Sequence, residues 1–146
     1  METNTILLVE DNRDDEDLTR RAFKKARIKN ELIVIRDGAE ALDYLFCTGQ
    51  HAKRNPDDMP QVVLLDLKLP KVNGLDVLKK IRGDARTKLL PVIILTSSRE
   101  EGDLLDGYAG GANSYIVKPV DTAQFEQCIQ QLGLYWLVLN ETVKKA

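Results

Sequence analysis

Five short apolar runs, separated by longer segments with helical periodicity, constrain the fold of this chain more than any other feature. The runs lie at 5–9, 31–36, 61–66, 91–96 and 113–117. Short and nearly continuous apolar runs are typical of strands buried on both faces, and their alternation with helices favours parallel pairing. The sequence therefore predicts a doubly wound α/β fold, in which helices cover both faces of a five-stranded parallel sheet.

Helices are expected at 14–28, 37–46, 75–82 and 99–109, and again after Asp121. The first begins with four acidic residues and ends with basic ones, an arrangement that suits the helix dipole. Leu18, Ala22 and Ala26 are its expected buried stripe. Two glycines weaken the fourth helix. The 47–60 loop is longer than most connections of its kind, and its length fits either a functional loop or a merely mobile one.

Composition limits the classes of function. The 146 residues suit one domain, and 21 basic against 23 acidic side chains give a net charge of −2, which offers no basic field for nucleic acid. Cys47 and Cys128 lack metal-ligand spacing and have one histidine, His51, to join them, so we expect reduced core thiols. No basic leader or apolar stretch of ~18 residues is present. We therefore expect a cytoplasmic protein that binds neither nucleic acid nor membrane.

Polar residues stand at the ends of four expected strands: Glu10 and Asp11, Asp66, Thr96, and Lys118. The carboxyl ends of parallel strands meet at one edge of a sheet, where open α/β folds place their binding sites. Carboxylates, a hydroxyl and an ammonium at that edge are suited to binding a divalent cation and a phosphoryl group.

Each of these residues also has an ordinary interpretation. Asp11 or Asn12 serves as a helix cap, and Asp66 as a turn residue. Thr96 is then an ordinary strand-end hydroxyl and Lys118 a surface lysine. Their joint occurrence in this order favours a site over unrelated coincidences.

In their context these residues resemble the receiver domain of two-component response regulators. The motifs that carry the resemblance are Glu10-Asp11, Asp66 with LKLPKVNG behind it, Thr96-Ser97, Tyr115 and Lys118-Pro119. The resemblance spans about 4–132 and implies a flavodoxin-like receiver, a single domain over 1–146 with a C-terminal helical extension at about 133–146. The 47–60 loop and Tyr135-Trp136-Leu137 resemble the stand-alone regulators of bacterial phytochrome histidine kinases.

The resemblance implies that Asp66 accepts a phosphoryl group from a phosphohistidine on a sensor histidine kinase. It also implies a Mg²⁺ site in which Asp11 and Asp66 bind the ion directly. The Lys68 backbone carbonyl adds a ligand there, and Glu10 acts through a water. Magnesium suits such a site because it prefers oxygen ligands, retains waters and offsets the charge of a transferring phosphoryl group. The protein is then a phosphoacceptor and not an enzyme, since it assists only its own phosphorylation and dephosphorylation.

Lys118 and Thr96 are implied to bind phosphoryl oxygens, and Tyr115 to rotate into the space that Thr96 vacates. Two positions depart from the commonest family pattern. Glu10 replaces an aspartate, which favours a water-bridged role at the metal. The Lys68 side chain is expected over the path of hydrolytic water, which leaves the phosphate lifetime open.

Two other classes of protein fit parts of the pattern. A pseudo-receiver binds partners without phosphorylation, but the intact acidic set favours a phosphorylated receiver. An aspartyl-phosphate hydrolase, such as a haloacid dehalogenase relative, carries its nucleophile after the first strand and a second Asp two positions later. Here Lys68 occupies that second position after Asp66, and no cap domain is apparent.

The predicted C-terminal helix has an apolar surface without an assigned partner. Asp121 is its expected N-cap, with Gln124 placed as in a capping box. Its expected core stripe begins with Phe125, Cys128 and Ile129. Its later half is also apolar on the opposite side, at Leu134, Leu137 and Val138. This favours a homodimer contact, with a kinase or effector contact as the alternative. Because little chain follows the receiver, output is expected through protein contacts.

Overall fold

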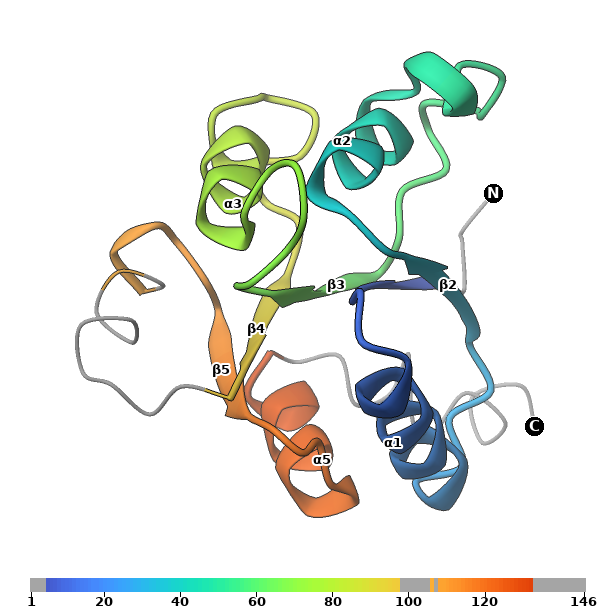
Figure 1. Ribbon diagram of the computed structural model, residues 1–146, viewed down its shortest axis with the longest axis vertical. Helices are drawn as coiled ribbons and strands as arrows, with labels where there is room; N and C mark the ends of the chain where they lie inside the picture. The colour runs from blue at the N-terminus through green and yellow to red at the C-terminus, as the bar shows by residue number, and fades with distance from the viewer. Residues whose placement is uncertain (1–4, 98–105, 107, 133–146) are drawn as a thin grey trace.

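The computed structural model describes residues 5–97, 106 and 108–132 (Figure 1). Its strands form one parallel sheet in the order β2-β1-β3-β4-β5. They are β1 (Thr5–Val9), β2 (Glu31–Ile35), β3 (Val62–Asp66), β4 (Val92–Thr96) and β5 (Ser114–Val117). The predicted five-stranded parallel sheet is confirmed; β1 has the predicted bounds, and each other strand is one residue shorter than predicted.

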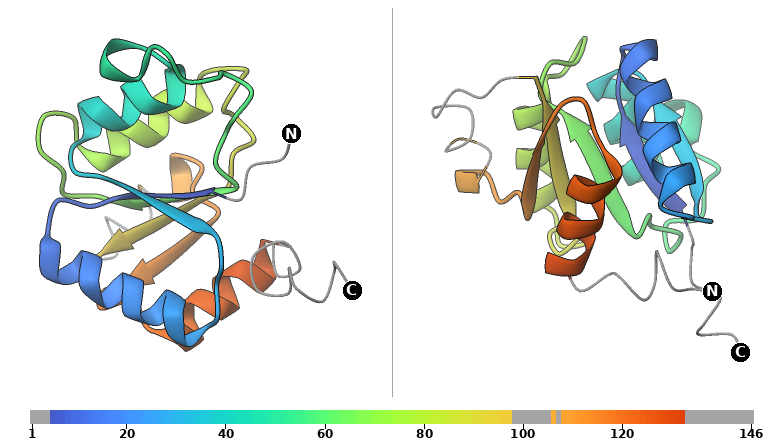
Figure 2. Two further views of the ribbon diagram at one scale, coloured as in Figure 1. Left: turned by 90° about the vertical axis from the view of Figure 1, so that its right-hand side faces the viewer. Right: turned by 90° about the horizontal axis from the view of Figure 1, so that it is seen from below.

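Two pairs of helices cover the two faces of the sheet (Figures 1 and 2). One face carries α1 (Arg13–Lys25) and α5 (Thr122–Gln131), and the other carries α2 (Gly38–Phe46) and α3 (Gly74–Arg82). Successive residues of a strand point to opposite faces, and each face therefore has its own apolar core. This is the doubly wound arrangement expected from the sequence.

Two predicted elements lie wholly or partly outside the described residues. Of the helix predicted at 99–109, Asp106, Tyr108 and Ala109 are helical. The extension predicted at 133–146 lies outside them. Among the helices that are described, none is long and apolar enough to cross a membrane.

The buried face of α1 differs from the predicted stripe. Ala22 is buried as expected, but Leu18 is 38% exposed, whereas Thr19 and Phe23 are buried. The helix is turned this way because the Phe23 ring packs on Phe125 of α5, with ring centroids 4.6 Å apart. Thr19 tolerates burial because its hydroxyl donates to a backbone carbonyl one turn back, at 3.0 Å. The prediction of Leu18 as a core residue is wrong.

Asp121 is the N-cap of α5 as predicted, but the Gln124 side chain bonds to the Asp121 carboxylate and not, as in a capping box, to its backbone N–H. The Asp121 carboxylate accepts from the Gln124 backbone N–H at 2.8 Å, and the Gln124 side chain donates to the same carboxylate at 3.0 Å. Phe125, Cys128 and Ile129 are buried, in agreement with the predicted core stripe. Cys128 and the half-buried Cys47 are both free thiols.

The 47–60 loop packs against α2. A short 3₁₀ helix, η1 (Gly49–His51), lies within it. His51 Nε2 lies 3.0 Å from the Glu40 carboxylate of α2, and the Arg54 guanidinium lies 3.8 Å above the centroid of the Tyr44 ring. These contacts make the loop part of the folded layer on the α2 side of the sheet.

Arg82, at the end of α3, joins several segments at the amino edge of the sheet. Its guanidinium donates, at distances from 2.7 to 3.1 Å, to four acceptors: the carbonyls of Lys88, Leu90 and Gly111, and Oδ1 of Asn113. Asn113 Oδ1 also accepts from the Val92 backbone N–H at 2.8 Å. The segments that precede β4 and β5 are thereby fixed to α3.

Candidate functional site

The structure brings the predicted acidic residues together at the carboxyl edge of the sheet. Glu10 and Asp11 follow β1, and Asp66 ends β3. One carboxylate oxygen from each of the three lies within 4.8 Å of the others. Glu10 is fully buried and Asp66 is 5% exposed, whereas Asp11 faces solvent. The cluster therefore has a buried floor and one open side.

Asn12, and not Asp11, caps the first helix. Asn12 Oδ1 accepts from the Asp15 backbone N–H at 3.0 Å. The helix start is thereby satisfied without the acid pair. The Asp11 carboxylate is left available to the acidic cluster.

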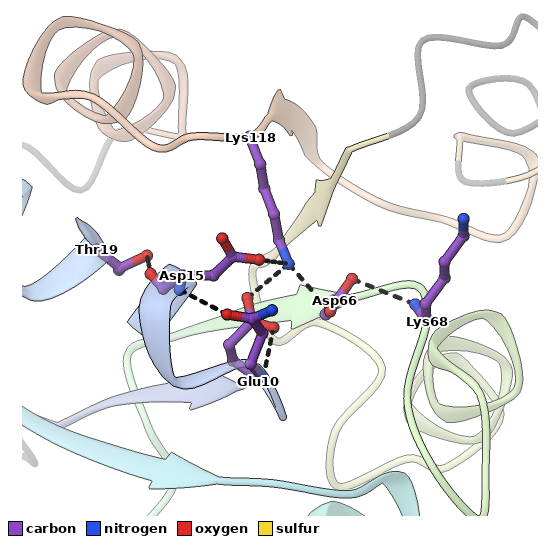
Figure 3. Close-up of polar contacts among 7 residues, drawn as sticks. Glu10, Asp15, Thr19, Asp66, Lys68 and Lys118 are labelled. Atoms are coloured by element: carbon purple, nitrogen blue, oxygen red, sulfur yellow. Dashed lines mark hydrogen bonds and ion pairs between the residues drawn. The ribbon is translucent and has the colours of Figure 1, made fainter. Parts of the chain in front are cut away.

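Lys118, which follows β5, inserts its ammonium among carboxylates (Figure 3). Nζ lies 2.7 Å from Glu10 Oε1, 2.9 Å from Asp15 Oδ2 and 3.1 Å from Asp66 Oδ2. Only 9% of its side chain is exposed, so the alternative of a surface lysine is wrong. The ammonium donates hydrogen bonds to Asp15 and Asp66, and its contact with Glu10 Oε1 is an ion pair. The Lys118-Pro119 peptide bond is cis.

Asp15 is the member of this cluster that the sequence reasoning missed. The sequence suggested for it only a favourable charge in the first helical turn. Its contact with Lys118 joins residues that are 103 positions apart. The available signal was that its helix starts directly after the acid pair Glu10-Asp11, which keeps its first turn close to the site.

The electrostatics of the cluster reflect an excess of carboxylates. Burial, reinforced by the neighbouring Asp66 and opposed by Lys118, raises the pKa of Glu10 to about 7. Burial alone would lower the pKa of Lys118, but Glu10, Asp15 and Asp66 outweigh it and raise that pKa. One ammonium thus serves several carboxylates, and a further cation at this place would relieve their repulsion.

The loop after Asp66 is held close to the strand end. Asp66 Oδ1 accepts from the Lys68 backbone N–H at 3.2 Å, and the Gly74 N–H donates to the Leu67 carbonyl at 2.9 Å. A Cβ atom at Gly74 would lie 2.2 Å from the Asp66 carbonyl oxygen, so only glycine permits this approach. The Lys68 side chain is exposed and points away from the Asp66 carboxylate (Figure 3). The expectation that this side chain lies over the path of hydrolytic water concerns the phosphorylated protein and stays a prediction.

Thr96 and Tyr115 lie on neighbouring strands beside the cluster. Thr96, at the end of β4, is 1% exposed, and its carbonyl accepts from the Lys118 backbone N–H at 2.7 Å. Tyr115 is on β5, two residues before the partner of Thr96 in the sheet register. Its hydroxyl oxygen is buried, and its ring centroid lies 6.0 Å from that of Tyr108. Thr96 thus ends β4 next to the segment that carries Lys118, and Tyr115 packs beside Tyr108 further back on β5.

Comparison with known families decides what kind of protein has this site. A family model described as the response regulator receiver domain matches residues 6–130. The chain belongs to the response regulator receiver family. Receiver domains are phosphoacceptors in signalling that histidine kinases phosphorylate, and they bind Mg²⁺ or Mn²⁺ in an acidic pocket. The resemblance noted in the sequence is confirmed.

Two relatives match nearly the whole chain. The probable methanogenesis regulatory protein FilR2 of Methanothrix harundinacea is 37% identical over 94% of this chain and 86% of its own length. The response regulator Rcp1 of Synechocystis is 36% identical over 90% of this chain and 88% of its own. Rcp1 is also known as a Mn²⁺-bound structure, with a TM-score of 0.74, 34% identity and coverage of 91% and 94% of the two chains.

Two solved bacteriophytochrome response regulators are more similar still. RtBRR is 49% identical, with a TM-score of 0.85, and the match covers 96% of this chain and 83% of RtBRR. AtBRR is 52% identical, with a TM-score of 0.83 and coverage of 93% and 96%. The predicted similarity to phytochrome response regulators is therefore confirmed.

Proposed function

We propose that this protein accepts a phosphoryl group on Asp66 from a sensor histidine kinase. The observation that carries the proposal is the position of the Asp66 carboxylate, which belongs to the acidic cluster and also lies 3.1 Å from the Lys118 ammonium. A nucleophilic carboxylate needs positive charge beside it when an anionic phosphoryl group approaches. Asp66 has one cation in place and carboxylates that suit a second.

Magnesium fits the residues present. Asp11 and Asp66 would bind it directly, the Lys68 backbone carbonyl would add a ligand, and Glu10 would act through a water. Hard oxygen donors of this kind suit Mg²⁺, and one carboxylate oxygen from each of Glu10, Asp11 and Asp66 lies within 4.8 Å of the others. When bound, the ion supplies positive charge to the transferring phosphoryl oxygens.

The chain's own residues supply the acceptor and its orientation. A bond forms between an Asp66 carboxylate oxygen and phosphorus as the bond from phosphorus to the kinase histidine nitrogen breaks, and that nitrogen keeps the electron pair. Lys118 donates to one phosphoryl oxygen and the Thr96 hydroxyl to another. Movement of Thr96 opens space for the Tyr115 ring, which changes the surface at β5. Beyond its own phosphorylation and dephosphorylation, the protein performs no enzymatic reaction.

For the partner we propose a phytochrome-type histidine kinase. The support is the identity of about half with RtBRR and AtBRR, both bacteriophytochrome response regulators. We further propose one receiver domain over 4–132, a helical extension at 133–146, a cytoplasmic location, and output through protein contacts without nucleic acid or membrane.

We also propose a homodimer that uses the helix predicted at 99–109, β5, α5 and the 133–146 extension. Tyr108 supports this because it is 53% exposed beside Tyr115, which leaves an aromatic side chain in solvent near β5. A variant with Leu134→Glu and Val138→Glu should sediment as a monomer and still accept phosphate. Unchanged sedimentation of a dimer would place the contact elsewhere.

Labelling with a small phosphodonor tests the central proposal. With Mg²⁺ and acetyl phosphate, the wild type should gain one phosphoryl group by mass spectrometry, and Asp66→Asn should gain none. Asp57→Asn, in which the same change is made at an exposed aspartate of the 47–60 loop, should be labelled like the wild type. Undiminished labelling of Asp66→Asn would refute the acceptor assignment, and absence of labelling in all three proteins would favour a pseudo-receiver.

A further inference from the structure

We propose that Asp15 is a positioning residue for phosphoryl acceptance: its carboxylate holds the Lys118 ammonium beside Asp66 before and after the phosphoryl group arrives. The proposal rests on the proposed function of Asp66. It gives α1 an indirect part in the chemistry, because, among the described residues that contact the Lys118 ammonium, Asp15 is the one that comes from a helix (Figure 3).

The three acceptors of Lys118 do not remain equivalent during the reaction. Asp66 loses its negative charge when its carboxylate becomes an acyl phosphate, so it becomes a weaker acceptor. Glu10 belongs to the acidic group that suits the metal ion. Asp15, at 2.9 Å from Nζ, is outside that group and is not altered by the reaction. It is therefore the partner that Lys118 keeps while it exchanges Asp66 for a phosphoryl oxygen.

A fixed anchor matters because of the chemistry of lysine. The ammonium is carried on a flexible four-carbon stem, and ordering such a stem at the moment of reaction costs entropy. A second anchor already in place leaves less of the stem to be ordered when the phosphoryl group arrives. The ammonium also contacts both Asp15 and Asp66, so its charge offsets the repulsion between Asp15 and an incoming phosphoryl group.

Two hydrogen bonds fix the position of the Asp15 backbone without using its carboxylate. Its backbone N–H donates to Asn12 Oδ1 at 3.0 Å, and its backbone carbonyl accepts from the Thr19 hydroxyl at 3.0 Å. Neither bond uses the carboxylate, so Asp15→Asn leaves the helix start intact. The exposed neighbour Asp14 offers a matched control, since Asp14→Asn removes the same charge from the same helical turn.

The test is the rate of phosphorylation of the full chain by acetyl phosphate at saturating Mg²⁺. Asp15→Asn should react about fivefold more slowly than the wild type, the scale of one partly exposed charge-assisted hydrogen bond. Asp14→Asn should stay within about twofold, and Asp15→Glu should recover part of the rate. Mg²⁺ affinity, measured by calorimetry, should differ little between Asp15→Asn and Asp14→Asn, since both remove one charge outside the acidic group.

A double-mutant cycle separates action through Lys118 from a general effect of Asp15. In a Lys118→Met background, Asp15→Asn should change the rate by less than about twofold. If Lys118→Met reacts too slowly to measure, urea unfolding of the wild type, the two single variants and the double variant gives the coupling free energy between Asp15 and Lys118. Equal rates for Asp15→Asn and Asp14→Asn, a faster Asp15→Asn protein, or zero coupling would each overturn the proposal. Loss of labelling in the wild type would instead refute the assignment of Asp66.

Discussion

Two cations, Lys118 at the carboxyl edge of the sheet and Arg82 at the amino edge, tie distant segments together by different means. Lys118 contacts three carboxylates, whereas Arg82 donates to three backbone carbonyls and an amide oxygen. The carboxylates raise the pKa of Lys118 although burial opposes them, and burial lowers the pKa of Arg82. The first cation sits among charged groups and the second among neutral ones.

This difference separates a reactive site from a structural joint. Carboxylates can bind a metal ion beside or in place of the ammonium, because either cation offsets their negative charge. Backbone carbonyls carry no net charge, so they do not repel one another strongly, and a bound metal ion would relieve no repulsion at the Arg82 contacts. We therefore expect Mg²⁺ to change the contribution of the Lys118 cluster to the free energy of unfolding and to leave the contribution of the Arg82 contacts unchanged.

The largest effect on stability is expected at the joint. Arg82→Met should lower the free energy of unfolding by about 3 kcal/mol, because several acceptors at the amino edge lose a charged donor together. Phosphorylation of Asp66 by acetyl phosphate should continue at temperatures where the variant is folded. Urea unfolding with and without Mg²⁺ measures the loss, which should be the same in both conditions. If Mg²⁺ reduced the loss of unfolding free energy in Arg82→Met, the proposed difference between the two edges of the sheet would be contradicted.

A smaller and metal-dependent loss is expected from the same substitution at the other edge. Lys118→Met should lower the free energy of unfolding by about 2 kcal/mol without Mg²⁺, since the buried Glu10 loses its partner but avoids the full cost by taking up a proton. Saturating Mg²⁺ should recover at least half of this loss. Mg²⁺ should also bind more tightly than to the wild type, because Lys118 no longer competes for Asp66. Weaker binding, measured by calorimetry, would show that Lys118 supports the metal site.

Glu16 is the opposite case to Lys118. There one ammonium contacts three carboxylates, whereas here one carboxylate contacts two guanidinium groups. Burial alone would raise the pKa of Glu16, but hydrogen bonds from Arg36 at 2.6 Å and Arg20 at 3.1 Å outweigh it and lower that pKa. A lowered folded-state pKa gives stability that is present above the unfolded value of 4.5 and is lost as pH falls through the folded value. Glu16→Gln should therefore cost about 1 kcal/mol at neutral pH and nothing in strong acid. Thermal unfolding of both proteins across this range should converge as pH falls; a constant difference would assign the effect to packing.

The smallest effect is expected at Lys68, a cation beside the acceptor whose side chain is exposed. Lys68→Ala should change the decay rate of the acyl phosphate by less than about threefold and leave Mg²⁺ affinity unchanged, since only its backbone is close to Asp66. Decay can be followed by the loss of phosphorylated protein after removal of the donor. A tenfold change would mean that the side chain reaches the phosphate once it has formed.

The sequence was most informative where local patterns determine structure. The predicted strands agree with the observed ones because a continuous apolar run is buried on both sides only in a sheet that helices cover on both faces. Parallel pairing of these strands then brings Glu10, Asp66 and Lys118 to one edge. Caps such as Asp121 were equally readable, since a cap involves neighbours within one turn.

The errors concern contacts that no local pattern encodes. Leu18 was expected in the core, but the packing of Phe23 on Phe125 sets the rotation of α1. Asp15 was read as one of several acids that suit a helix dipole, because nothing in its surroundings in the sequence indicates a lysine 103 positions away.

The order of the strands has a consequence for the newly made protein. β1 lies inside the sheet and is synthesised first, whereas β5 is an edge strand that leaves the ribosome late and brings Lys118 with it. A nascent chain that already contains Asp66 still lacks the ammonium, 52 positions further on, that completes the acceptor. Because chains emerge from their N-terminus, a kinase meets a competent target only after the last strand has docked. On the proposed function, the protein therefore accepts phosphate only once β5 has been made and has paired with β4.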